Sequence, residues 1–331
     1  MHKALRLPAA VCFAAASLAI LCSAASAQVT VGQLYPGTPE ARCIGTNYDE
    51  LQISVASGAS YTIPAPGGVL TSWSTSAAAG AGQLYEMKVF RPGAGSYTVV
   101  AHDGPHPLIP GIVNTFPVDI PVQAGDIVGI HLPTGSSPTA CGFETGSIAD
   151  VYGWREGDFP DGAIFTPEET EPEWRLNVAA TLLPPPSLTA LNGAKGSVKG
   201  GTSVTLTGTN LAEVKGVSFG STAATFTVTS ETQITAKVPA AKKLGKVPVT
   251  VTTVAGTASS PTSFEYQGCK VPNLSGKKLK PAKKALKKAG CKLGTVKLTG
   301  DATNKTGKVI KQNPKSGKIL APSAKVGVKL G

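Results

Sequence analysis

The fold of the middle of this chain is decided by the stretch Gly200-Gly201-Thr202-Ser203-Val204-Thr205-Leu206-Thr207-Gly208-Thr209-Asn210-Leu211. Val204 and Leu206 alternate with polar residues, so they lie on one face of an extended strand. Val249 and Val251 repeat this alternation further along the chain. Gly200, Gly201 and Gly208 permit the turns between such strands. The pattern predicts half-buried strands of a β-sandwich.

Residues 184–268 resemble an IPT/TIG domain, an immunoglobulin-like β-sandwich. The stretch above carries the resemblance together with Pro186-Ser187-Leu188, Val217-Ser218-Phe219-Gly220, Thr232-Gln233-Ile234-Thr235-Ala236-Lys237-Val238-Pro239 and Val247-Pro248-Val249-Thr250-Val251. In exported bacterial proteins, the resemblance implies a spacer or an adhesion element. Relatives in nuclear transcription factors bind DNA, a use that is not expected of an exported protein.

The next 63 residues, 269–331, hold 17 lysines, no arginine and one acid, Asp301, which gives a net charge of +16. They resemble a PASTA domain, a small extracellular module of bacterial cell-wall-associated kinases and transpeptidases. The resemblance rests on Val271-Pro272-Asn273-Leu274, Ala282-Lys283-Lys284-Ala285-Leu286-Lys287-Lys288-Ala289-Gly290 and Gln312-Asn313-Pro314-Lys315-Ser316-Gly317. It implies a small α+β unit at the cell wall that binds peptidoglycan fragments, and it does not imply catalysis.

A helix is also predicted within this segment from its own residues. Pro281 suits the first turn of a helix, where its missing N–H has no partner to lose. Gly290 is placed to end the helix in a left-handed conformation. At helical spacing, one face is apolar and the opposite face is basic. The apolar face comprises Ala282, Ala285, Leu286 and Ala289, and the basic face comprises Lys283, Lys284, Lys287 and Lys288.

Charge divides the chain into domains. Residues 28–183 hold 5 basic and 16 acidic residues, a net charge of −11, whereas residues 184–268 hold 7 and 3, a net charge of +4. Such contrasts mark separate domains. Pro184-Pro185-Pro186 is a stiff linker and Gln267-Gly268 a short joint. We therefore expect a signal segment at 1–27, an acidic domain at 28–183, an IPT/TIG-like domain at 184–268 and a lysine-rich PASTA-like domain at 269–331.

The acidic domain is predicted to be an all-β sandwich. Short strand-like runs are separated by Gly, Pro, Ser and Asp clusters, as in sandwiches. The run Val118–Ile130 also resembles the hairpins of jelly-roll-like exported domains. The predicted strands are Ser54–Ile63, Leu84–Arg91, Tyr97–His102, Thr115–Pro121, Ile127–Leu132 and a last strand, Trp174–Leu182, that returns beside the first. The expected fold class is therefore mainly β and multidomain.

The start of the sequence predicts export. Lys3 and Arg6 precede an apolar run, Leu7–Leu21, and small residues follow at Ala25-Ser26-Ala27. The run is too short to span a membrane and suits a signal peptide cleaved between Ala27 and Gln28. A secreted protein, extracellular or associated with the cell wall, is therefore expected, with no membrane span.

Four cysteines remain after the signal segment: Cys43, Cys141, Cys269 and Cys291. An even number in an exported chain favours disulfides over metal sites. Three pairings are possible, and the domain layout favours Cys43–Cys141 and Cys269–Cys291. The alternative is that they are free buried thiols. A disulfide would help the terminal domain most, because a domain of about 60 residues buries little apolar surface.

Catalysis and metal binding have little support in the sequence. His102 and His106 flank Asp103-Gly104-Pro105, which breaks the helix that a zinc motif needs. Asp158 and Asp161 in Gly157-Asp158-Phe159-Pro160-Asp161-Gly162 form a weak calcium candidate. The surrounding acidic stretch, Asp150–Glu173, is interleaved with Trp154, Phe159, Phe165 and Trp174. It is interpreted as a solvated loop, with a carbohydrate groove or a two-carboxylate glycosidase as alternatives. No cofactor and no enzymatic activity are expected.

The charge of residues 269–331 predicts attraction to polyanions, with Lys283, Lys284, Lys287 and Lys288 as candidate binding residues. The expected partners are peptidoglycan or anionic wall polymers. A physiological nucleic acid is not expected, because the segment has no Phe, Tyr, Trp, Arg or His to stack on or read bases. The acidic domain is expected to bind a ligand or mediate adhesion. The alternatives are a polysaccharide-active enzyme and a purely structural surface protein.

Overall fold

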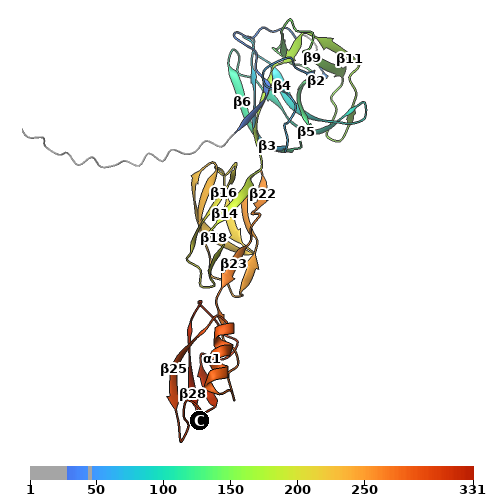
Figure 1. Ribbon diagram of the computed structural model, residues 1–331. Coiled ribbons are helices and arrows are strands. Elements are labelled where there is room, and N and C mark those ends of the chain that lie inside the picture. Colours follow the sequence, from blue (N-terminus) through green and yellow to red (C-terminus); the bar gives the residue numbers. More distant parts are fainter. Residues whose placement is uncertain (1–27, 44–46) are drawn as a thin grey trace, which may run out of the picture.

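The computed structural model describes residues 28–43 and 47–331, so the predicted signal segment and Ala27 lie outside the described residues. The described chain is almost entirely β structure and contains one α-helix. Three domains follow one another along the chain (Figure 1), each with its own hydrophobic core. No described helix has the length and apolar character needed to cross a membrane.

The N-terminal domain is a sandwich of two antiparallel sheets. The smaller sheet has the strand order β1 (Val29–Gln33), β13 (Val178–Leu183), β3 (Gly68–Ser76) and β6 (Val113–Val122). The larger sheet has the order β10 (Ile164–Phe165), β5 (Tyr97–Pro107), β4 (Leu84–Pro92), β7 (Ile127–Leu132), β2 (Tyr48–Ser54), β9 (Val151–Glu156) and β11 (Glu169–Pro172). A separate ribbon joins β8 (Gly142–Glu144) to β12 (Trp174–Leu176).

Aromatic residues from both sheets meet in the core of this domain. Trp73 of β3 stacks on Tyr85 of β4 with ring centroids 6.2 Å apart, and both side chains are fully buried. The last strand, β13, pairs with β1, which was not among the predicted strands. One predicted strand is wrong: most of 54–63 forms loops, and the strand lies earlier, at Tyr48–Ser54. The observed strand was not predicted because it contains the polar residues Asp49, Glu50 and Gln52, which are nevertheless buried.

The middle domain has two sheets. The larger has the order β14 (Ser187–Asn192), β16 (Ser203–Thr209), β19 (Gln233–Lys237), β18 (Thr222–Ser230), β17 (Gly216–Phe219), β21 (Val249–Thr253) and β22 (Gly256–Ser259). The smaller has the order β15 (Lys195–Ser197), β23 (Phe264–Gln267) and β20 (Gly245–Val247). Phe219 and Phe264 join the sheets edge to face, with centroids 5.2 Å apart. Val204, Leu206, Val249 and Val251 are all buried, as their alternation predicts.

The terminal domain packs one helix on a small sheet. α1 (Leu279–Lys288) buries Ala282 and Leu286 completely, against a core that includes Val326 and Val328. Gly290 ends the helix region with a φ of 71°. The sheet has the order β25 (Lys292–Leu298), β28 (Lys325–Leu330) and β26 (Val309–Asn313), and a short pair joins β24 (Cys269–Lys270) to β27 (Ile319–Leu320).

The side chain of Gln312 connects two stretches of this domain that are far apart in the sequence. Its side chain accepts a hydrogen bond from the Leu274 backbone N–H at 2.8 Å and donates one to the Pro272 carbonyl at 3.0 Å. The amide thereby joins the start of the domain to β26. One glutamine satisfies backbone groups that would otherwise have no partner, which stabilises the loop before α1.

Candidate functional site

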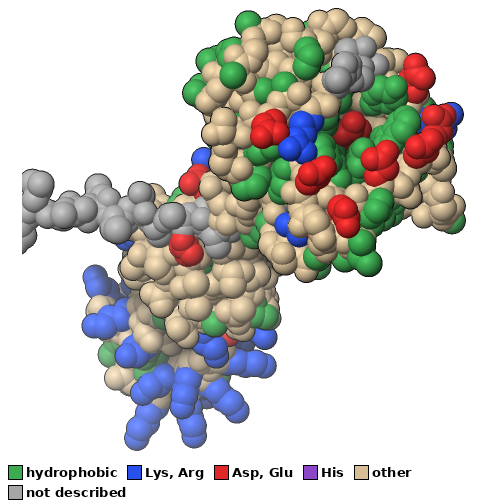
Figure 2. Space-filling model, turned by 90° about the horizontal axis from the view of Figure 1, so that it is seen from above, with side chains coloured by type: hydrophobic (Ala, Val, Ile, Leu, Met, Phe, Trp, Pro, Cys, Tyr) green, Lys and Arg blue, Asp and Glu red, His purple; other side chains and the backbone are tan. Residues whose placement is uncertain are grey.

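Lysines surround the terminal domain, which holds a single acidic residue, Asp301. Within the described parts of the chain, no lysine of residues 269–331 forms an ion pair. Figure 2 shows blue side chains gathered around the part of the molecule farthest from the N-terminal domain. On the N-terminal domain, in contrast, acidic side chains lie beside hydrophobic ones. The surface of the terminal domain is therefore a concentrated positive field that is open to an anionic partner.

Three lysines form a row across the outer face of the terminal sheet. Lys297 of β25 lies opposite Lys329 of β28, and Lys329 lies opposite Lys311 of β26. On the inner face, Val326, Val328 and Leu330 of β28 enter the core. Like charges placed directly opposite each other destabilise a sheet. The row is therefore a surface on which an anion would relieve repulsion.

A groove accompanies this row. It has a volume of about 590 Å³, and its lining includes Lys297, Lys311, Lys325 and Lys329. Gly327 also lines the groove, and a Cβ built there would meet only ordinary contacts, at 3.4 Å from the Thr295 carbonyl oxygen and 3.6 Å from that of Asn313. The missing side chain at position 327 therefore helps to keep the groove open. We call this surface the lysine groove.

The structure separates the four lysines predicted as binding residues. Lys283, Lys284 and Lys287 line a second cavity, of about 790 Å³, together with Lys280 and Lys292. Lys288 lies apart, in a depression shared with residues 244–245 and 265–268 of the preceding domain and joint. Three lysines of the helix can therefore contact one ligand. The lysines of the lysine groove were not predicted from the sequence, because only the strand register of the sheet brings them together.

Each of the four cysteines among the described residues has a partner within its own domain. Disulfides join Cys43 to Cys141 and Cys269 to Cys291, the pairing that the domain layout favoured. The second closes a sequence separation of 22 residues and ties the first strand of the terminal domain to the segment after α1. Disulfides are typical of proteins in oxidising, extracellular compartments.

The two calcium candidates, Asp158 and Asp161, contact different side chains of the protein, Lys88 and His102. The Lys88 ammonium donates to Asp158 Oδ1 at 2.6 Å and to Asp49 Oδ2 at 3.0 Å. Burial acts to raise the pKa of Asp158, but the hydrogen bond and charge of Lys88 outweigh it and lower that pKa. Asp161 bonds to His102 Nδ1 at 2.8 Å, and this contact raises the pKa of His102.

Asp49, His131 and Asp158 place ligand atoms within 4.8 Å of one another, but Asp161 is not in this group. Lys88 is 1% exposed and already bonds to both aspartates of this group. His131 Nδ1 lies 2.7 Å from Asp49 Oδ1. The residues could hold a cation, and the lysine supplies that positive charge.

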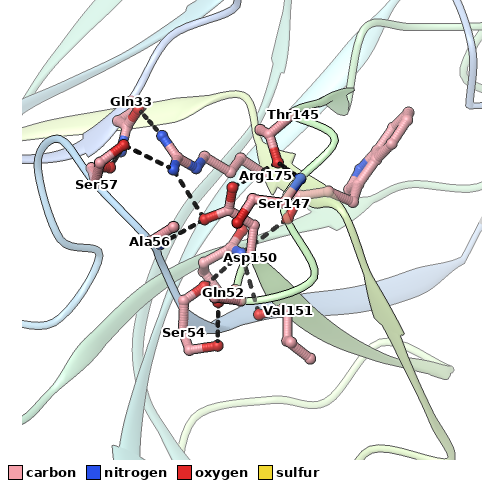
Figure 3. A network of polar contacts seen from close by, with 12 residues as sticks. Gln33, Gln52, Ser54, Ala56, Ser57, Thr145, Ser147, Asp150, Val151 and Arg175 are labelled. Carbon is pink, nitrogen blue, oxygen red and sulfur yellow. Dashed lines mark hydrogen bonds and ion pairs between the residues drawn. The ribbon is translucent and has the colours of Figure 1, made fainter.

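Asp150, the first acid of the predicted acidic stretch, is structural (Figure 3). It accepts hydrogen bonds from the Ala56 backbone N–H at 2.6 Å and from Thr145, and it pairs with Arg175 at 2.8 Å. Burial acts to raise the pKa of Asp150, but these donors outweigh it and lower the pKa. Arg175 continues to Gln33 Oε1 of β1 at 2.8 Å. The network joins segments that are far apart in the sequence.

A pocket of about 380 Å³ lies on the face of the larger sheet that carries Met87, because Glu50 pairs with Ile130 and Ile130 pairs with Met87. β2, β9 and β11 supply its carboxylates and most of its aromatic rings, and the Cys43–Cys141 disulfide and Trp174 of β12 also line it. We call it the aromatic pocket. It is lined by Arg42, Cys43, Tyr48, Glu50, Leu132, Cys141, Tyr152, Trp154, Glu171 and Trp174.

Register brings the polar and aromatic side chains of this pocket together. Glu50 of β2 lies opposite Trp154 of β9, and Tyr152 of β9 lies opposite Glu171 of β11. The exposed Glu171 carboxylate accepts from Tyr152 at 3.2 Å and from Trp154 Nε1 at 3.4 Å. The sequence indicated Trp154 and Trp174 but not Tyr48 or Glu50, although alternating Tyr48, Glu50 and Gln52 could have suggested a strand with a functional face.

Comparisons with known families confirm the two domain assignments. An IPT/TIG domain matches residues 186–266, and a PASTA domain matches residues 270–331. The protein is therefore a multidomain β protein in which an IPT/TIG domain is followed by a C-terminal PASTA domain. No curated protein matches the chain.

Similar solved structures align only partly. An auxiliary nutrient binding protein from Bacteroides thetaiotaomicron is 16% identical over 27% of this chain and 24% of its own, with a TM-score of 0.22. SGBP-B from a complex xyloglucan utilization locus in Bacteroides uniformis is 14% identical over 64% of this chain and 55% of its own, with a TM-score of 0.24. This chain spans about a quarter of the first structure.

Proposed function

We propose that this is an exported, non-enzymatic binding protein whose terminal domain holds it to peptidoglycan or anionic polymers of the cell wall. The lysine groove carries this proposal, because it aligns Lys297, Lys329 and Lys311 across three strands without an acidic partner. Peptidoglycan stem peptides carry carboxylates, and other wall polymers carry phosphates. Charge-assisted hydrogen bonds from lysine to such groups are stronger than neutral ones.

In this proposal, the IPT/TIG domain and the N-terminal domain extend outward from the wall-bound terminal domain. The IPT/TIG domain serves as a spacer, since its core is apolar and its own net charge is modest. The N-terminal domain presents a surface for a ligand or for adhesion. Both disulfides favour an extracellular location.

Filling the lysine groove without changing its charge tests the proposal. Gly327→Val adds a side chain that suits a strand, and its Cβ would meet only ordinary contacts at that position. We expect this variant to sediment less with insoluble peptidoglycan than the unchanged protein. Equal sedimentation, with folding intact by circular dichroism, would show that the groove is not the binding site.

A polysaccharide-degrading enzyme is the second candidate, on one observation. The aromatic pocket holds two acidic side chains, Glu50 and Glu171, in contrasting environments, as glycosidases require of their acid and their second carboxylate. Release of new reducing ends from a polysaccharide, lost in Glu50→Gln, would establish this activity.

A further inference from the structure

We propose that the aromatic pocket binds an uncharged glycan, whose sugar rings pack on its tyrosines and tryptophans while their hydroxyl groups bond to Glu50 and Glu171. The inference rests on the proposed function in one respect: it names the ligand class of the N-terminal domain. It does not require the terminal domain to bind a wall. Its failure and that of wall binding are therefore separable.

The buried carboxyl group of Glu50 is the first feature that indicates a ligand. It lines the pocket and is 7% exposed, and its Oε2 atom has no hydrogen-bond partner among residues 28–43 and 47–331. Buried polar atoms in native proteins nearly always have partners, and one without a partner calls for an explanation. A ligand that brings a hydroxyl group to this oxygen would satisfy it. The unpartnered acid therefore indicates a ligand with hydrogen-bonding groups.

The aromatic rings supply the second argument. Tyr48 and Trp154 meet edge to face with centroids 5.2 Å apart, and Tyr152 and Trp174 lie 6.3 Å apart. The face of an aromatic ring is electron-rich and attracts weakly positive C–H groups. A sugar ring has C–H groups on its faces and hydroxyls at its edge, so it matches rings and carboxyls side by side. Binding sites commonly combine aromatic walls with a few placed polar groups.

Charge narrows the ligand class. Burial, with smaller contributions from the charges of Glu171 and Asp49, raises the pKa of Glu50 to about 8. The other groups facing Glu50 are Tyr85 of β4 and Tyr152 of β9, and Arg42 lines the same pocket. Near neutral pH, Glu50 is thus protonated and can donate as well as accept. Arg42 is already paired with Glu40 and Glu144, and the Glu171 carboxylate already accepts hydrogen bonds from Tyr152 and Trp154. Such a pocket favours an uncharged polar ligand over an ion.

The tryptophans provide a direct readout, because the chain has only three. Trp73 is buried in the core, whereas Trp154 and Trp174 line the pocket. The test titrates residues 28–331 with cellohexaose, xylohexaose, maltohexaose and chitohexaose while following tryptophan fluorescence and, separately, heat by calorimetry. We expect saturable binding of at least one of these oligosaccharides. Tetramethylammonium and polygalacturonate serve as the cationic and anionic comparisons.

Variants assign the binding to the pocket. Trp154→Ala and Glu50→Ala should each weaken binding about tenfold or more, as expected when a stacking surface or a key hydrogen bond is removed. Glu168→Gln is the matched control, since Glu168 pairs with Arg155 at 3.2 Å and does not line the pocket. Replacing Lys297, Lys311 and Lys329 with glutamine should leave sugar binding unchanged, which separates this result from wall binding.

The pH dependence gives a signature that a purely structural role would not produce. With a Glu50 pKa of about 8, binding that needs the protonated acid should be about tenfold weaker at pH 9 than at pH 7. Glu50→Gln, which imitates the protonated form, should bind equally at both. No binding of the four oligosaccharides, binding only of tetramethylammonium or polygalacturonate, or a flat pH profile in the unchanged protein would overturn the proposal.

Discussion

Lys297 lies directly opposite Lys329 in the pairing of β25 with β28, and Lys311 lies opposite Lys329 on its other side. Three adjacent positive charges on one sheet face are unfavourable for folding. They are chemically useful only when an anion is bound across them. This relationship connects the sequence, through strand register, to the proposed attachment to the wall.

Removing the lysine row should therefore stabilise the terminal domain. We expect the triple variant Lys297→Gln, Lys311→Gln, Lys329→Gln to gain about 0.5–1 kcal/mol in unfolding free energy at low salt, since two opposed like-charge pairs disappear. The gain should shrink at about 0.5 M salt, where screening is strong. Urea unfolding at both salt concentrations measures this, and a loss of stability would show that the row does not repel.

Close backbone contact in the middle domain makes Gly208 irreplaceable. A Cβ on Gly208 would lie 1.8 Å from the Ser187 carbonyl oxygen, where β14 pairs with β16. Gly208→Ala should destabilise the domain by several kcal/mol, because backbone must move. At Gly216, a Cβ would meet nothing within 4 Å, so Gly216→Ala is the control and should change stability by less than about 1 kcal/mol. Thermal unfolding compares the two, and similar effects would refute the contact argument.

Lys88 stabilises the N-terminal domain by neutralising buried Asp49. Lys88→Met should lower the free energy of unfolding by about 3–5 kcal/mol, because it leaves an uncompensated buried charge. Asp158→Asn should cost about 1 kcal/mol or less, since the Asp158 side chain is 58% exposed.

Millimolar calcium should not raise the melting temperature, because the Lys88 ammonium occupies the site. A calcium-dependent rise that is absent in Asp158→Asn would establish a metal site instead.

Glu50 should make the N-terminal domain less stable as pH rises. Its pKa is raised from 4.5 to about 8 on folding, so the folded state retains a proton that the unfolded state releases. Its contribution is fully present below pH 4.5 and is lost as pH rises through about 8. Glu50→Gln should remove this part of the slope and be more stable than the unchanged protein at about pH 9. Parallel stability-pH curves for the two proteins would show that Glu50 does not titrate this way.

Short-range patterns predicted the second and third domains well. Alternation placed Val204 and Val249 in a core, and helical spacing placed Ala282 and Leu286 on the buried face of α1. The two candidate sites depend on contacts between distant strands. Glu50 meets Trp154 only because β2 pairs with β9, about a hundred residues later. Strand register of this kind is set by the whole sheet, and no local pattern around Glu50 or Lys297 specifies it.

Sedimentation with insoluble peptidoglycan at about 0.5 M salt, where the screening length is only a few ångströms, tests the central claim most directly. Residues 28–331 are compared with the triple variant at Lys297, Lys311 and Lys329 and with a helix triple variant, Lys283→Gln, Lys284→Gln, Lys287→Gln, which loses the same charge. The account predicts that the unchanged protein and the helix variant sediment and the groove variant does not. Equal losses of sedimentation in both variants would mean that the lysines act only as diffuse charge. If the unchanged protein did not sediment, even with polymer-bearing walls, attachment to the wall would be contradicted.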